Sequence, residues 1–297
     1  MKCFAPWHSI LVRFNGDIVP DGVYLKRYGN VLQTPLNDLL NSFTASYTRD
    51  SIRAGHLPPE CQQCALKEAS VGHSRRKFFE DILNPMLENT NYDYSKNFTD
   101  IYFLEFNMSN ICNLKCRMCD GINSSAWVKD DLKLAKNGNP YFRRVADPEF
   151  GYTNKSQEII QRLFEDPEPF MNLRYLSIKG GEPYMEPANK IILQKFIDLG
   201  IAKNVTLDWT TNGTIVDDEI QELARQYGET KWTVSLEGTG GLYEYIRGGK
   251  NFTFDQLNDN IKQYDVDRII IAVTIMAYNI AHLDKIYWWF EDNKQDN

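Results

Sequence analysis

Three of the six cysteines lie close together, at Cys112, Cys116 and Cys119 in the stretch NMSNICNLKCRMCDG. Thiolates are good ligands for zinc and for iron–sulfur clusters, and four of them would complete the coordination of a zinc ion or a four-iron cluster. Three thiolates leave one iron of a [4Fe-4S] cluster without a protein ligand, as catalytic metal sites keep a position open for substrate. The spacing therefore predicts a catalytic cluster with one open iron.

The other cysteines are Cys61 and Cys64, in the motif CQQC, and Cys3 near the start of the chain. Six cysteines in 297 residues are too few for a disulfide scaffold. In a reducing compartment, clustered thiols more often bind metal or act in catalysis. We therefore expect a second group of metal ligands.

Five β-rich segments follow one another along the chain: IYFLEF, LRYLSI, VTLDWT, KWTVSL and RIIIAVTI. Helical patterns such as KIILQKFIDLG and DDEIQELARQYG separate most of them. Strands that alternate with helices predict parallel pairing, in a doubly wound sheet or a barrel.

A polar motif follows each of these segments directly: NMSNICNLKC, KGGEPY, TNGT, EGTGG and AYN, in that order. Loops at the carboxyl ends of strands are where α/β folds, barrels especially, build their active sites. The sequence therefore predicts that the five motifs converge on one site.

With C-x3-C-x2-C after the first strand, GGEP after the second, and then TTNGT and SLEG, residues 98 to about 290 resemble the radical S-adenosylmethionine (SAM) enzymes. The resemblance implies an α/β fold, a partial (β/α)6 TIM-like barrel. It also implies that Cys112, Cys116 and Cys119 hold a [4Fe-4S] cluster whose open iron binds SAM. Reductive cleavage of SAM would give a 5′-deoxyadenosyl radical that abstracts a substrate hydrogen.

Further site residues follow from the same resemblance. Gly180 and Gly181 would allow close backbone approach, and the carboxylate of Glu182 would accept hydrogen bonds from the SAM ammonium group. Met118 stands where relatives usually have an aromatic residue that packs on adenine. Five more positions match residues that contact SAM or line its pocket: Asn212, Ser235, Glu237, Arg247 and Asn279.

Residues 1–66 are predicted to form a small α+β module. Alternating residues on both sides of Asn15-Gly16 indicate a hairpin, and PLNDLLNSF and SYTRDSIRAGH indicate two short helices. Residues 67–97 form a linking helix in which Pro85 is expected to cause a kink or a stop. Residues 98–297 would be the barrel.

The N-terminal module resembles the twitch domain, a shortened relative of the iron–sulfur SPASM domain. The resemblance implies that Cys3, Cys61 and Cys64 bind an auxiliary iron–sulfur cluster. Asp21 stands where relatives usually have a cysteine, so it is either a fourth, oxygen ligand or no ligand, with His8 as an alternative donor. Structural zinc and an ordinary buried thiol at Cys3 remain competing interpretations.

The function implied is oxidative modification of a peptide or protein, with an electron donor such as flavodoxin or ferredoxin. Dehydrogenation of a sugar or aminocyclitol is an alternative. A non-catalytic iron–sulfur or zinc scaffold protein is a further one. A small-molecule substrate therefore remains an alternative to a peptide or protein.

Charge and hydropathy indicate which partners and which cell compartment to expect. A net charge of −7 and a pI near 5.3 disfavour general nucleic-acid binding. No segment of 18 apolar residues and no signal-like start are present, so we expect a cytoplasmic protein.

No sixth barrel strand follows RIIIAVTI before the final helical stretch KIYWWFEDNKQDN. The barrel would be truncated, naturally short or completed by a partner. An uncovered edge strand favours self-association or partner binding.

Overall fold

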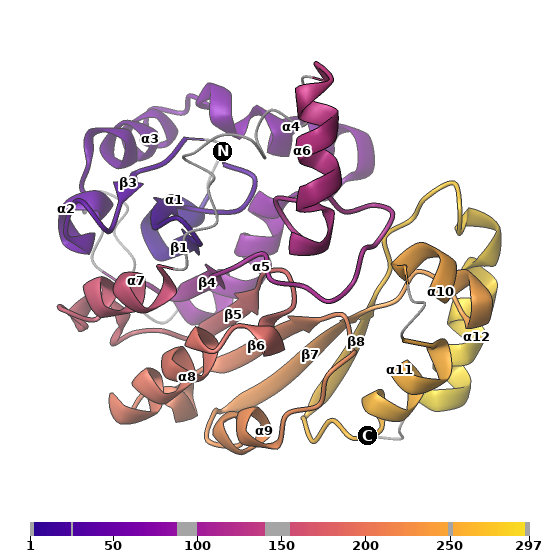
Figure 1. The fold of residues 1–297 in the computed structure, drawn as a ribbon. Coiled ribbons are helices and arrows are strands. Elements are labelled where there is room, and N and C mark those ends of the chain that lie inside the picture. Colours follow the sequence, from indigo (N-terminus) through magenta and orange to yellow (C-terminus); the bar gives the residue numbers. More distant parts are fainter. Residues whose placement is uncertain (1–2, 25, 88–99, 140–154, 249–251, 295–297) are drawn as a thin grey trace.

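The computed structural model describes residues 3–24, 26–87, 100–139, 155–248 and 252–294. Its centre is an eight-stranded sheet in the order β3-β2-β1-β4-β5-β6-β7-β8 (Figure 1). The parallel strands β4 to β8 correspond to the five predicted β-rich segments. Their bounds are Phe103–Asn107, Tyr175–Lys179, Thr206–Thr211, Glu229–Ser235 and Arg268–Ala272.

Helices connect these strands and cover the sheet. They are α6 (Val128–Lys136), α7 (Ser156–Leu163), α8 (Ala188–Asp198), α9 (Asp218–Ala224), α10 (Gly240–Arg247), α11 (Phe254–Ile261) and α12 (Leu283–Asn293). Parallel strands joined through helices give the predicted α/β architecture, a partial TIM-like barrel.

The two faces of the sheet differ because successive side chains on a strand point in opposite directions. On β6, Leu207 and Trp209 are fully buried in the core beneath the helices. Asp208 and Thr210 alternate with these two residues along the strand and so belong to the opposite, inner face. The apolar face therefore holds the sheet to its helices, and the inner face is left for polar groups.

The N-terminal part begins with α1 (Ala5–His8), β1 (Ser9–Arg13), β2 (Asp17–Val19) and β3 (Gly29–Asn30). Antiparallel pairing of β1 with β2 confirms the predicted hairpin, and Gly16 has the positive φ of 87° that a glycine tolerates. β1 also pairs in parallel with β4. The module therefore extends the barrel sheet, which the sequence did not predict.

The remaining N-terminal elements are helical. α2 (Leu36–Leu40) and α3 (Phe43–Arg53) confirm the two predicted short helices. A 3₁₀ turn (Pro59–Cys61), α4 (Gln62–Val71) and α5 (Arg75–Leu87) follow. Residue 66, the proposed domain boundary, lies inside α4, and Pro85 lies inside α5. The described part of the predicted linking helix is not one helix, since α4 ends at Val71 and α5 begins at Arg75, and its residues 88–97 lie outside the described residues.

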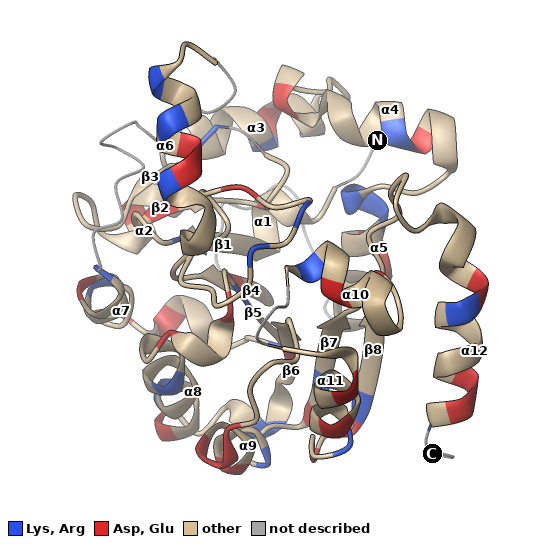
Figure 2. Ribbon diagram, turned by 45° about the vertical axis from the view of Figure 1, so that its right-hand side comes forward, with Lys and Arg blue, Asp and Glu red and all other residues tan. Residues whose placement is uncertain are grey.

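β8 is an edge of the sheet, and no sixth barrel strand pairs with it among the residues that the structure describes. Its residues are half-buried or exposed. Charged residues of both signs occur together on helices such as α6 and α12 (Figure 2). In the described parts of the chain, no helix is long and apolar enough to cross a membrane.

Candidate active site

A pocket with a cavity volume of about 210 Å³ opens at the carboxyl ends of the barrel strands. Cys112, Cys116 and Cys119 line it together, as predicted from their spacing. The other predicted residues that line it are Gly180, Gly181, Asn212, Ser235, Glu237, Arg247 and Met118. Loops after β4, β5, β6 and β7 therefore meet at the cysteines.

The loop that carries the three cysteines is fixed by hydrogen bonds to its backbone. The hydroxyl of Ser124 donates to the Leu114 carbonyl at 2.7 Å, and the indole Nε1 of Trp127 donates to the Cys116 carbonyl at 2.8 Å. These bonds help to hold the loop in shape, which is the preorganisation that a cluster site needs.

Gly180 and Gly181 bring the loop after β5 directly against the cysteine loop. The N–H of Gly181 donates to the Ser109 carbonyl at 2.9 Å, and the N–H of Glu182 donates to the Ile111 carbonyl at 2.7 Å. A Cβ on Gly181 would lie 2.3 Å from the Ile111 carbonyl oxygen. The close backbone approach that was predicted for these glycines is thus an approach to the cysteine loop.

Two polar side chains contact the sulfur atoms. Asn212 Nδ2 lies 3.7 Å from Cys112 Sγ, and Arg247 Nη1 lies 3.6 Å from Cys116 Sγ. Burial raises the pKa of all three thiols, that of Cys119 to about 12. Metal binding must therefore displace protons from these thiols.

Arg247 is held by a second charged group. Its Nε donates to Glu237 Oε2 at 2.5 Å, and both side chains are buried. Glu237 Oε1 accepts a hydrogen bond from the Thr274 backbone N–H at 3.3 Å. The pair fixes the guanidinium at the wall of the pocket beside Cys116, so that a surface position for Arg247 is excluded.

Two predicted residues lie behind the pocket wall. The carboxylate of Glu182 is fully buried and accepts hydrogen bonds from the Thr211 hydroxyl at 2.9 Å and the Asn212 N–H at 2.7 Å. Burial raises the pKa of Glu182 to about 7. Asn279 is also fully buried, and its Nδ2 donates to the carbonyls of Glu237 and Thr274. Neither side chain lines the pocket, and their contacts with SAM remain predictions.

Sequence reasoning missed several residues that line this pocket. They are Leu114, Asn123, Ser124, Thr210, Thr211 and Thr274. The threonines belong to the motifs TTNGT and AVTI at strand ends, so their positions could be seen in the sequence. The sequence analysis assigned roles to other residues of these motifs and not to the threonines.

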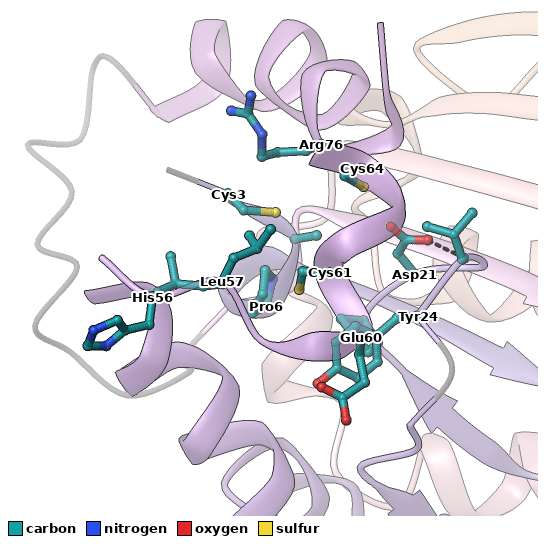
Figure 3. Close-up of a pocket in the computed structure, with 14 residues that line it drawn as sticks. Cys3, Pro6, Asp21, Tyr24, His56, Leu57, Glu60, Cys61, Cys64 and Arg76 are labelled. Atoms are coloured by element: carbon teal, nitrogen blue, oxygen red, sulfur yellow. Dashed lines mark hydrogen bonds between the residues drawn. The ribbon is translucent and has the colours of Figure 1, made fainter. Parts of the chain in front are cut away.

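A second pocket, with a cavity volume of about 40 Å³, lies in the N-terminal module. Cys3, Cys61, Cys64 and Asp21 all line it, as predicted (Figure 3). Asp21 Oδ1 accepts a hydrogen bond from the Val23 N–H at 2.5 Å. In Figure 3 the other carboxylate oxygen points toward the side of the pocket where Cys64 lies.

Burial dominates the electrostatics of this second pocket. It raises the pKa of the Cys3 and Asp21 side chains, and it raises that of Cys61 to about 12. Within the described ranges, no three His, Cys, Asp or Glu side chains are gathered as one metal ion would require.

His8 does not line the second pocket. Its ring is buried against Tyr102, and its Nδ1 lies 3.2 Å from the Asp100 carbonyl. His56 and Glu60, which the sequence analysis did not single out, do line the pocket. In Figure 3 the imidazole of His56 points away from the thiols, and Glu60 lies beside Tyr24.

Comparison with solved structures gives weak overall likeness. One similar structure is native anSMEcpe with bound AdoMet, at 17% identity and a TM-score of 0.42, covering 64% of this chain and 49% of that one. Another is Streptococcus suis SuiB bound to S-adenosylmethionine, at 18% identity and a TM-score of 0.41, covering 97% and 60%.

A third is SuiB bound to the precursor peptide SuiA, at 16% identity and a TM-score of 0.40, covering 100% of this chain and 62% of that one. The chain thus spans about half to three fifths of the length of these proteins. No curated protein matches it.

Two family models match the chain. The model of the radical SAM superfamily covers residues 106–287, and the model of SPASM, an iron–sulfur cluster-binding domain, covers residues 3–65. These matches assign a [4Fe-4S] cluster and SAM to the barrel and a further iron–sulfur cluster to the N-terminal domain. Since the first match spans more than half of its residues, the protein belongs to the radical SAM superfamily and carries an iron–sulfur domain of the SPASM type ahead of its barrel.

Proposed function

We propose that Cys112, Cys116 and Cys119 hold the SAM-binding cluster and that the pocket beside them holds SAM. The observation that carries this proposal is the convergence of three thiols with polar groups from the loops after β5, β6 and β7 in one pocket. When bound, the reduced cluster and SAM supply a 5′-deoxyadenosyl radical that removes a hydrogen atom from a substrate.

The residues present fit this pair of groups. Arg247 offers a buried cation to a carboxylate, and Glu237 keeps the guanidinium at the pocket wall. Asn212 and Ser235 offer an amide and a hydroxyl to the polar parts of a nucleoside. We assign Gly180, Gly181, Glu182 and Asn279 to the support of this pocket, since they shape or buttress its loops.

For the auxiliary cluster we propose Cys3, Cys61, Cys64 and Asp21 as ligands. All four line one pocket, and Asp21 has one carboxylate oxygen turned toward it (Figure 3). An oxygen ligand in place of a thiolate changes the reduction potential of a cluster. This centre would accept an electron from the substrate, and flavodoxin or ferredoxin would reduce the cluster in the barrel.

We further propose that the substrate is a peptide or protein, modified oxidatively. In support, β8 is an edge of the sheet among the residues that the structure describes, and an extended peptide could pair with its backbone groups. The loop after β8 and the helix α10 also expose apolar side chains, with Ile275 61%, Tyr278 51% and Tyr245 47% exposed. The rings of Tyr245 and Tyr278 are 5.7 Å apart, and the guanidinium of Arg117, from the cysteine loop, packs on Tyr245.

The same exposed rings favour a second candidate, dehydrogenation of a sugar or aminocyclitol, because sugar rings also pack on aromatic faces. The two candidate substrates can be distinguished by which of them gives its hydrogen atom to the 5′-deoxyadenosyl radical. The reduced protein is incubated with SAM and either a pool of peptides built from deuterated amino acids or deuterated monosaccharides and aminocyclitols.

We expect deuterium in the 5′-deoxyadenosine formed with peptides, as measured by mass spectrometry, and none with the Cys116→Ala variant. Deuterium from the sugars alone would move the assignment to the second candidate. Equal product from the Cys116→Ala variant would reject the proposed cluster site.

A further inference from the structure

A chain of charged side chains runs between the two pockets. Arg75, the first residue of α5, donates from Nη2 to Glu105 Oε2 at 3.0 Å, and its Nε lies 4.0 Å from Asp21 Oδ1. Lys179 Nζ donates to the same Glu105 oxygen at 2.9 Å. Asp21 lines the auxiliary pocket, and Lys179 directly precedes Gly180, which lines the pocket beside the three cysteines.

Packing fixes the position of the Arg75 side chain. Its guanidinium carbon lies 4.3 Å from the ring centroid of Phe78, 4.9 Å from that of Phe79 and 5.7 Å from that of Phe103. The side chain is 21% exposed. A cation held over aromatic rings and bonded to a buried carboxylate has little freedom to move.

The two oxygens of Asp21 have different surroundings. Oδ1 accepts the Val23 N–H and is the oxygen nearest Arg75. The other oxygen points into the pocket of Cys3, Cys61 and Cys64 (Figure 3). Arg75 and Val23 therefore lie on one side of the carboxylate. The other oxygen faces the pocket, where it could bind an iron of the cluster.

Glu105 ties this arrangement to the barrel. It lies in β4, in register with Leu11 of β1 and Ser177 of β5, and is 6% exposed. Its carboxylate is shared by Arg75 from the linking helix and Lys179 from the end of β5. The position of Arg75 is thus set by the strands that carry the site in the barrel.

We propose that Arg75 is a positioning residue for the auxiliary cluster, which fixes Asp21 with one oxygen toward the cluster and is itself anchored by Glu105. The inference rests on the proposed ligand role of Asp21. A fixed cation near the cluster stabilises its reduced state, which carries the extra negative charge. Without Arg75 the carboxylate keeps only the Val23 N–H on Oδ1, and the reduction potential of the auxiliary cluster falls because the nearby cation is lost.

The test uses the full-length chain with Cys112, Cys116 and Cys119 all changed to Ala, so that iron binds at the auxiliary site alone. Arg75→Gln is compared with Lys77→Gln in this background. Lys77 lies on the same helix, donates to the Gly72 carbonyl at 2.8 Å and is not among the residues that line the auxiliary pocket. Iron per chain, the electron paramagnetic resonance spectrum of the reduced protein and the midpoint potential are measured after anaerobic reconstitution.

We expect Arg75→Gln to change the spectrum and lower the midpoint potential, Arg75→Lys to restore both in part, and Lys77→Gln to leave the spectrum and the potential as in the parent. In an Asp21→Cys background, where a thiolate replaces the oxygen, Arg75→Gln should leave the spectrum unchanged. If Arg75→Gln does not fold, as judged by circular dichroism, Arg75→Met takes its place, because it also removes the cation, and the same direction of change is expected.

A spectrum and potential that are identical to the parent's in the variant that folds would overturn the inference, as would a parent that binds no iron. Formation of 5′-deoxyadenosine by the wild-type protein is measured separately. Its absence would contradict the proposed function and leave the result for Arg75 standing, because the test background performs no SAM chemistry.

Discussion

Glu182 is a carboxyl group that the fold encloses completely, and it gives the molecule a pH dependence at the residue scale. Burial raises its pKa from 4.5 to about 7, against the opposing effect of the hydrogen bonds from Asn212 and Thr211. The folded protein therefore binds a proton more tightly than the unfolded chain. The resulting stability is fully present below pH 4.5 and is lost as the pH rises through about 7.

The prediction concerns the iron-free protein and its Glu182→Gln variant. Glutamine does not titrate, so it removes this contribution and leaves the others. We expect the free energy of unfolding of the wild type, relative to the variant, to fall between pH 5 and pH 8. Urea titrations at the two pH values measure it, and parallel pH profiles for the two proteins would contradict the buried, protonated state of Glu182.

The candidate ligand residues were the part of the site most visible in the sequence. The spacing of Cys112, Cys116 and Cys119, and the pairing of Cys61 with Cys64, are visible in the chain itself. The sequence also placed Glu182 and Asn279 at strand ends correctly. It could not give the direction of their side chains, because a residue after a strand can face the pocket or the backbone of a neighbouring loop.

At the scale of elements, the contact between the loops after β4 and β5 determines whether the cysteines are in place. Gly181 permits this contact, since a Cβ there would overlap backbone atoms of Asn110 and Ile111. Backbone atoms cannot give way as the end of a flexible side chain can. The glycine therefore serves the geometry of the cluster loop.

We predict that Gly181→Ala destabilises the protein by roughly 1–3 kcal/mol, the usual cost of overpacking, and reduces the iron bound in the barrel. Gly241→Ala is the matched control, because a Cβ at Gly241 meets nothing within 4 Å. Chemical denaturation and iron analysis of both variants measure these effects. Equal stability and equal iron in the two variants would show that the close approach has no consequence.

The elements themselves followed from local patterns. Alternation and length identified all five barrel strands, and Asn15-Gly16 identified the hairpin. The parallel pairing of β1 with β4 could not be predicted, since the paired residues lie about 90 positions apart and neither strand encodes its distant partner. That pairing joins the two modules in one sheet.

For the whole molecule, this continuous sheet places both pockets on one framework. Glu105 in β4 is bonded to Arg75 beside the auxiliary pocket and to Lys179 at the end of β5. The two proposed cluster sites are thus connected through one sheet, which would suit the removal of a hydrogen atom at one and the acceptance of an electron at the other. The central claim is therefore that one chain binds two clusters and uses only one of them to cleave SAM.

The most direct test is anaerobic reconstitution of the wild type and of the Cys64→Ala variant, with iron counted per chain and 5′-deoxyadenosine measured after addition of dithionite and SAM. We predict about eight irons in the wild type, the sum of two four-iron clusters, and about four in the variant, with 5′-deoxyadenosine formed by both. Zinc in place of iron, or iron without SAM cleavage, would contradict the account.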